Sequence, residues 1–139
     1  MQAAPVLDSF ALLAFLRGEV GDDQVAALLE KAGARDVPVQ MTEVNYAEVK
    51  YIVIRKDGAD RWEEIARELP TLPIEFQPAT RPLADLAADI KARHKLSIAD
   101  AFAVALAKQK KAELVTGDPE FKSVEREIKI TWLKGRKAT

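Results

Sequence analysis

The chain has 139 residues, 48% hydrophobic and 31% charged, which is the balance of a soluble globular protein with one core. Its 21 basic and 22 acidic residues give a net charge of −1, which excludes a nucleic-acid binder that is basic over its whole surface. The lack of cysteine excludes disulfides and thiolate metal sites and favours the cytoplasm, and no apolar run is long enough to cross a membrane.

Short apolar strands and longer helices alternate along the chain. Residues 1–5 carry no basic side chain, so we expect no signal peptide before the first strand. Apolar periodicity, prolines and glycines predict these elements in chain order: strand 6–7, helix 9–17, helix 22–32, strand 37–41, helix 43–55, helix 60–69, strand 74–76, helix 82–94, helix 98–110, strand 114–115 and strand 128–133. Thr42 and Ser97 are suited to cap the helices that follow them.

This alternation of strands and helices predicts the fold class. Parallel strands need crossover connections, and helices are the usual ones. We therefore expect an α/β fold, a three-layer α/β/α sandwich with a short, mainly parallel central sheet. No repeat, low-complexity tract or linker interrupts the pattern, so we expect residues 1–139 to form a single domain.

Four acidic residues form the candidate site. Asp8 follows the first strand and Asp118 follows the fourth, after Gly117, which we expect to loosen the backbone there. In open parallel sheets, the ligand crevice lies beyond the carboxyl ends of the strands. Asp100 falls in the first turn of a predicted helix, and Glu48 falls in the middle of the helix after the second strand. We expect the four carboxylates to converge.

Helix capping is an alternative explanation for three of these acids. Asp8 can cap the helix that follows it, and Asp118, which precedes a proline, is a good N-cap. Asp100 stands three residues after Ser97, as in a capping box. Capping and metal binding are compatible roles, so a cap does not exclude a ligand.

Two acids lie where an acid is unexpected. Asp100 is the only charged residue in IADAFAVAL, residues 98–106, and a helix that is apolar all round is a buried helix. An unpaired carboxylate in such a place is costly. Glu48 has no capping role and lies on a stripe that we expect to pack on the sheet, formed by Val44, Ala47, Tyr51 and Ile52.

Converging carboxylates require a counter-charge, because they cannot all remain ionised side by side. Oxygen ligands, with no cysteine and a single histidine, His94, favour Mg²⁺ or Mn²⁺ over zinc. Such an ion can activate water and stabilise charge on a phosphodiester. The single histidine also makes a Ser-His-Asp triad implausible. The acids therefore predict a divalent-metal site.

Four segments resemble the motifs of PIN domains, specifically of the VapC-like ribonuclease toxins. They are VLDSFALLAFL, VNYAEVKY, LSIADAFAVALA and LVTGDPEF, which place the family's acids at Asp8, Glu48, Asp100 and Asp118. The resemblance implies an endoribonuclease that depends on Mg²⁺ or Mn²⁺ and whose four acids coordinate the metal and position the hydrolytic water. It also implies a homodimer that a cognate VapB-like antitoxin inhibits.

The resemblance also indicates supporting residues. Ser9 and Thr116 occupy positions where the family often has a hydroxyl, and we expect them to support the acids by hydrogen bonds. Asn45 and Glu120 are secondary candidates. Glu43 competes as the second acid, but its place in the first turn of a helix is explained by the helix dipole.

Two other classes of function fit parts of the sequence. A non-catalytic PIN-like module that binds RNA or protein could retain the acids for structure, and it would cleave nothing with any divalent ion. Receiver domains usually have an acidic pair after the first strand, and haloacid-dehalogenase phosphatases have Asp-x-Asp. Here Asp8 is followed by Ser9 and Phe10, so both phosphoryl-handling folds fit poorly.

Overall fold

The computed structural model describes residues 3–134, so the ends of the predicted domain, 1–2 and 135–139, lie outside the described residues. The elements in chain order are β1 (Val6–Leu7), α1 (Ser9–Arg17), α2 (Asp22–Arg35), β2 (Val39–Thr42), α3 (Glu43–Asp57), α4 (Ala59–Glu68), the 3-10 helix η1 (Leu69–Thr71), β3 (Ile74–Gln77), α5 (Arg81–Arg93), α6 (Ile98–Lys110), β4 (Leu114–Thr116), the 3-10 helix η2 (Pro119–Val124) and β5 (Ile130–Trp132). Within the described part of the chain, no helix has the length and apolar character needed to cross a bilayer.

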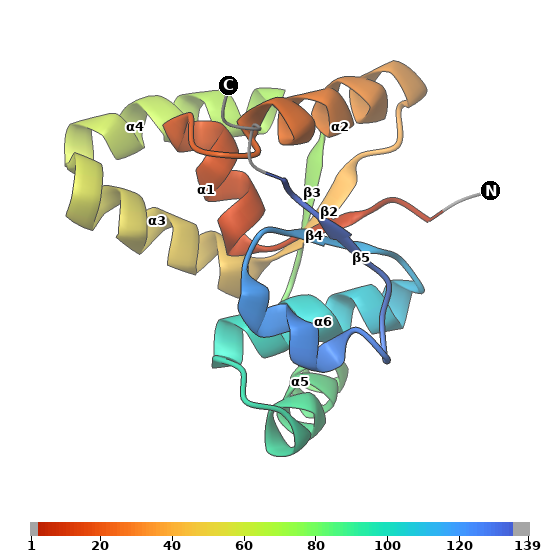
Figure 1. Ribbon diagram of the computed structural model, residues 1–139. Coiled ribbons are helices and arrows are strands. Elements are labelled where there is room, and N and C mark those ends of the chain that lie inside the picture. Colours follow the sequence, from red (N-terminus) through yellow and green to blue (C-terminus); the bar gives the residue numbers. More distant parts are fainter. Residues whose placement is uncertain (1–2, 135–139) are drawn as a thin grey trace.

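The five strands form one parallel sheet in the order β3-β2-β1-β4-β5 (Figure 1). From β1 in the centre, the chain adds β2 and then β3 on one side. It then returns to place β4 and β5 on the other side, so the direction of strand order reverses between β1 and β4. Helices cover both faces of this sheet, which confirms the predicted α/β sandwich.

Both faces of the central strands are buried by helices, and neighbouring side chains along a strand point to opposite faces. Val6 and Leu114 pack with the apolar side chains of α5 and α6. Leu7 and Val115, the next residue of each strand, pack with α1 and α2 on the other face. This arrangement explains why two consecutive apolar residues suffice for β1, the shortest strand.

Capping residues fix where the helices begin. The side chains of Asp8, Thr42, Thr80 and Ser97 each accept a hydrogen bond from a backbone N–H in the first turn of the helix that follows. The two 3-10 helices do not follow from apolar periodicity, because each is short and begins around a proline. Strand β2 begins two residues later than predicted, after Pro38, which has no N–H for the sheet.

The packed face of α3 differs from the expected one. Ala47 and Tyr51 are exposed, so this half of the predicted stripe is wrong, whereas Val44 and Ile52 are half-buried. The fully buried positions are Asn45, Val49 and Val53. The true stripe begins with an asparagine, and this polar residue hides it in a search for apolar periodicity.

Candidate metal centre

Asp8 and Asp118 lie at the carboxyl ends of two adjacent strands. Strands β1 and β4 are paired in parallel, Asp8 follows β1 directly, and Asp118 follows β4 after Gly117. Strand order reverses between these two strands, and ligand sites of open parallel sheets lie at such a reversal. The fold therefore puts the two acids at the usual place for a ligand.

Helices α6 and α3 bring two further acids to the same edge. Because α6 leads back into the parallel strand β4, its first turn lies at the carboxyl edge of the sheet, and Asp100 is its third residue. Helix α3 starts directly after β2, at the same edge, and Glu48 follows about one turn later. Glu48 is half-buried.

Asp8 is the most buried of these acids, with 1% of its surface exposed. Its Oδ1 accepts a hydrogen bond from the N–H of Ala11 at 2.8 Å, and its Oδ2 accepts one from Oγ1 of Thr116 at 2.5 Å. Burial is the main reason that the pKa of Asp8 is raised to about 8. The two hydrogen bonds lower this pKa, and the nearby carboxylates of Asp100 and Asp118 add to the rise. Asp8 thus caps α1 and also carries a strongly perturbed carboxyl group.

Asp100, Asp118 and Glu120 form the tightest group, in which one carboxylate oxygen of each residue lies within 4.8 Å of the other two. The 3-10 helix η2 positions Glu120, because Oδ1 of Asp118 caps it by accepting the N–H of Glu120 at 2.9 Å. The N–H of Asp118 in turn donates to Oγ1 of Thr116 at 3.0 Å. Thr116 therefore links Asp8 to the loop that carries the other two acids.

Asp100 connects all the acids electrostatically. It is 8% exposed, and burial raises its pKa to about 7, followed by the charges of Asp118 and Glu48. Asp8 and Glu48 lie outside the 4.8 Å group, but Asp100 raises the pKa of Asp8 and Glu48 raises that of Asp100. The four predicted acids and Glu120 are therefore close enough to influence one another electrostatically, and we call these five acids the acid site.

No basic side chain forms an ion pair with these acids within the described residues 3–134. The ion pairs found there, with N–O distances up to 4.0 Å, involve none of the five acids. Asp57 shows the usual alternative, because a hydrogen bond from Arg17 lowers the pKa of its carboxyl group. A divalent cation fits the five-acid site, since its donors are hard carboxylate oxygens.

A buried polar network holds the helices that carry the acids. Asn45 is fully buried, and its Nδ2 donates to Oγ of Ser9 at 3.0 Å and to the carbonyl of Ala99 at 3.2 Å. Its backbone N–H donates to Oγ1 of Thr42, which also contacts its side-chain oxygen. Asn45 thereby joins α1, α3 and α6. Ser9 hydrogen-bonds with Asn45 and not with a carboxylate, so its support of the acids is indirect.

Gly117 has a packing role rather than the conformational one expected from sequence. Its backbone is outside the left-handed region, so the residue does not need glycine for its dihedral angles. A Cβ atom at this position would lie 2.3 Å from Cε1 of Phe10, far inside contact distance. Glycine here therefore leaves room for the close approach of the Phe10 ring, and a larger residue would displace the ring or the loop.

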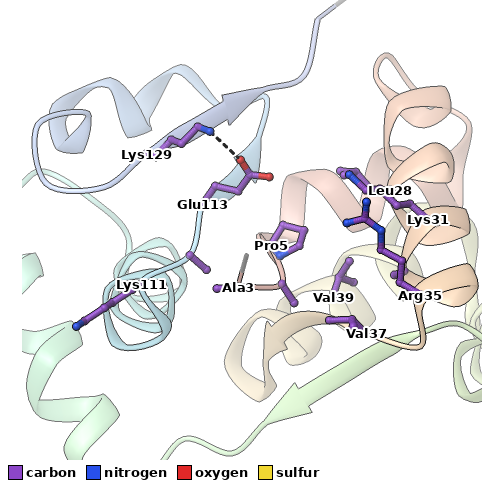
Figure 2. A pocket seen from close by; sticks show the side chains of 13 residues that line it. Ala3, Pro5, Leu28, Lys31, Arg35, Val37, Val39, Lys111, Glu113 and Lys129 are labelled. Atoms are coloured by element: carbon purple, nitrogen blue, oxygen red, sulfur yellow. Dashed lines mark ion pairs between the residues drawn. The ribbon is translucent and has the colours of Figure 1, made fainter. Parts of the chain in front are cut away.

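A separate cleft of about 770 Å³ lies at the opposite edge of the sheet (Figure 2). Its walls include residues that precede the strands, such as Pro5 before β1 and Glu113 before β4. Arg35 lies on one wall, and Lys129 pairs with Glu113 on the other. None of the five acids is among its described lining residues, so the acid site is distinct from this cleft.

Comparisons with known proteins agree with this architecture. The family model "PIN domain" matches residues 6–127, and no curated protein matches the sequence. VapBC2 from Rickettsia felis, solved with a promoter DNA fragment, has a TM-score of 0.75 at 16% identity, covering 94% of this chain and 99% of that one. DNA-bound VapBC from Salmonella typhimurium has a TM-score of 0.74 at 14% identity, covering 96% and 100%.

A third solved structure is a VapC20 of Mycobacterium tuberculosis, described as a toxin that cleaves the sarcin–ricin loop. It has a TM-score of 0.69 at 17% identity, covering 87% of this chain and 95% of that chain. At these identities the structures show a shared fold. The family model, however, spans most of the chain and includes the segments with Asp8, Glu48, Asp100 and Asp118. The chain belongs to the PIN-domain family.

Proposed function

We propose that this protein is a metal-dependent endoribonuclease, the toxin of a type II toxin–antitoxin pair, which hydrolyses RNA phosphodiester bonds. The observation that carries the proposal is the acid cluster at the strand-order reversal, which lacks a basic partner among residues 3–134. Structural ion pairs would have neutralised such acids, as Arg17 does for Asp57. Acids placed together without a basic partner favour a bound cation.

Asp8, Asp100, Asp118 and Glu48 would hold Mg²⁺ or Mn²⁺, with Glu120 beside them. When bound, the ion lowers the pKa of a water molecule and stabilises negative charge on the phosphodiester. The hydroxyl of Thr116 fixes one oxygen of Asp8, as a supporting residue does for a metal ligand. Glu48 is half-buried and would accept a hydrogen bond from the attacking water and orient it.

The substrate and partner rest on similarity to solved toxins. RNA as substrate is supported by the likeness to the M. tuberculosis toxin described as cleaving the sarcin–ricin loop. A VapB-like antitoxin is supported by the VapBC complexes, which share the fold over nearly the whole chain. We also propose a cytoplasmic location and a homodimer, for which exposed Tyr51 and Ile54, three residues apart on α3, offer an apolar surface.

The test is cleavage of RNA by highly purified protein. We expect cleavage in Mg²⁺ or Mn²⁺ and none in EDTA. Asp100→Asn should cleave no RNA, although its thermal stability in EDTA should equal or exceed that of the wild type. Asp85→Asn is the matched control, because Asp85 is an exposed aspartate on α5 outside the site. Full activity of Asp100→Asn would exclude the proposed role of the acids, and absence of cleavage with either ion would favour a non-catalytic binding module.

A further inference from the structure

Phe10 places an aromatic ring at the surface beside the acid site. It is the second residue of α1 and lies two residues after Asp8, and 38% of its surface is exposed. The residues on either side of it, Ser9 and Ala11, are buried. Single exposed apolar residues are common on protein surfaces, so exposure alone carries no conclusion.

The ring lies close to the acid-bearing loop. The Cδ1, Cε1 and Cζ atoms of Phe10 would lie 3.0, 2.3 and 2.7 Å from a Cβ built on Gly117. Gly117 stands between Thr116 and Asp118, so one edge of the ring rests on the backbone that carries the acid. With one edge of its ring against this backbone and 38% of its surface exposed, Phe10 is a partly open aromatic surface.

Ile98 is a second exposed apolar residue near the acids, on the helix that carries Asp100. It is the first residue of α6, two residues before Asp100, and it is 50% exposed. Among the large apolar side chains exposed in residues 3–134, Phe10 and Ile98 are the two in the first turns of the helices that carry Asp8 and Asp100. Metal binding requires neither of them, and of the two only Phe10 presents a ring.

We infer that the Phe10 ring stacks on an unpaired nucleobase next to the scissile phosphate. The inference rests on the proposed function, because it takes the acid site to hold the phosphodiester. A phosphate at the five acids would place its flanking nucleotide beside the α1 first turn and Gly117. Every base has a π-face, and stacking on an aromatic side chain is the common way in which proteins hold single-stranded RNA.

The inference gives Phe10 a role in selecting the substrate. In an RNA duplex the bases are stacked on one another, so a ring at the protein surface cannot reach a base face. The cleaved bond should therefore have an unpaired nucleotide beside it, in a loop, bulge or single-stranded segment. Stacking tolerates any base, so Phe10 selects for an unpaired structure rather than for a sequence.

The test uses oligoribonucleotides with single bases removed. The probe is the shortest oligoribonucleotide that the wild-type protein cleaves, intact and with an abasic residue at each position flanking the cut. In the wild type, one abasic substitution should lower kcat/KM about 10-fold, or about 1.4 kcal/mol, within the range for a base on an aromatic ring. Phe10→Leu should cleave the intact probe about 10-fold more slowly and lose the abasic effect.

Two further variants separate stacking from a structural role. Phe10→Met keeps an apolar side chain against Gly117 without a ring, and it should behave like Phe10→Leu in the same assay. Ile98→Ala removes the other exposed apolar side chain and should keep the full abasic effect. Phe10 variants that keep the abasic effect would overturn the inference alone, whereas a wild type that cleaves no RNA would overturn the proposed function and the inference together.

Discussion

Replacing Asp8 with Asn should change how the stability of the metal-free protein depends on pH. Burial raises the pKa of Asp8 from 3.8 to about 8. Between those values the unfolded chain has lost this proton while the folded protein keeps it, so the free energy of unfolding falls as pH rises. One such proton changes that free energy by about 1.4 kcal/mol per pH unit.

From pH 5 to pH 7 the wild type should therefore lose roughly 2 to 3 kcal/mol that Asp8→Asn does not lose. Urea unfolding in EDTA, followed by circular dichroism at both pH values, measures this difference. Asp57→Asn is the control: Arg17 lowers the pKa of Asp57, so this group is ionised in both states above about pH 5 and adds no slope. Parallel pH profiles for the wild type and Asp8→Asn would refute the reasoning.

Three further predictions concern residues around the site and across the fold. Gly117→Ala should lower the calorimetric unfolding temperature, because its Cβ would collide with Phe10, and an unchanged temperature would contradict that contact. Asn45→Ala should lower the free energy of unfolding by roughly 2 kcal/mol in urea, because it leaves buried partners unpaired, and a neutral effect would count against the network. Glu127→Gln should lower the melting temperature at pH 7, since Lys108 above all holds the pKa of Glu127 at about 2. The difference in melting temperature between the wild type and Glu127→Gln should shrink as pH falls from about 4.5 toward 2. A difference that stays constant over this range would contradict the role of Glu127 as a charged partner.

The sequence was sufficient to predict most of the architecture because local signals agree with the fold. Ser97 caps α6 as predicted, and the strands alternate with helices, which supply the crossovers that a parallel sheet needs. Asp8 and Asp118 could be placed at one edge because the carboxyl ends of parallel strands meet there. The burial of Asp100 followed from its wholly apolar surroundings, and the structure shows it 8% exposed.

Other features depend on contacts between distant segments and leave no periodic signal. Glu120 reaches the acids because Asp118 caps a 3-10 helix that was not predicted from the sequence. Asn45 is a polar residue on the buried face of α3, so the pattern of hydrophobic residues predicted the wrong face. Gly117 makes room for the ring of Phe10, which lies more than a hundred positions earlier in the chain.

The most direct test of the central claim is calorimetric titration of the metal-free protein with Mn²⁺ near pH 7, in buffers of different ionisation enthalpy. If the carboxylates form one metal site, Mn²⁺ should bind and release protons, because Asp8 and Asp100 have raised pKa values without metal. Binding should be lost in Asp100→Asn and kept in Asp85→Asn. Equal binding by Asp100→Asn and the wild type, or no binding by the wild type, would contradict the account.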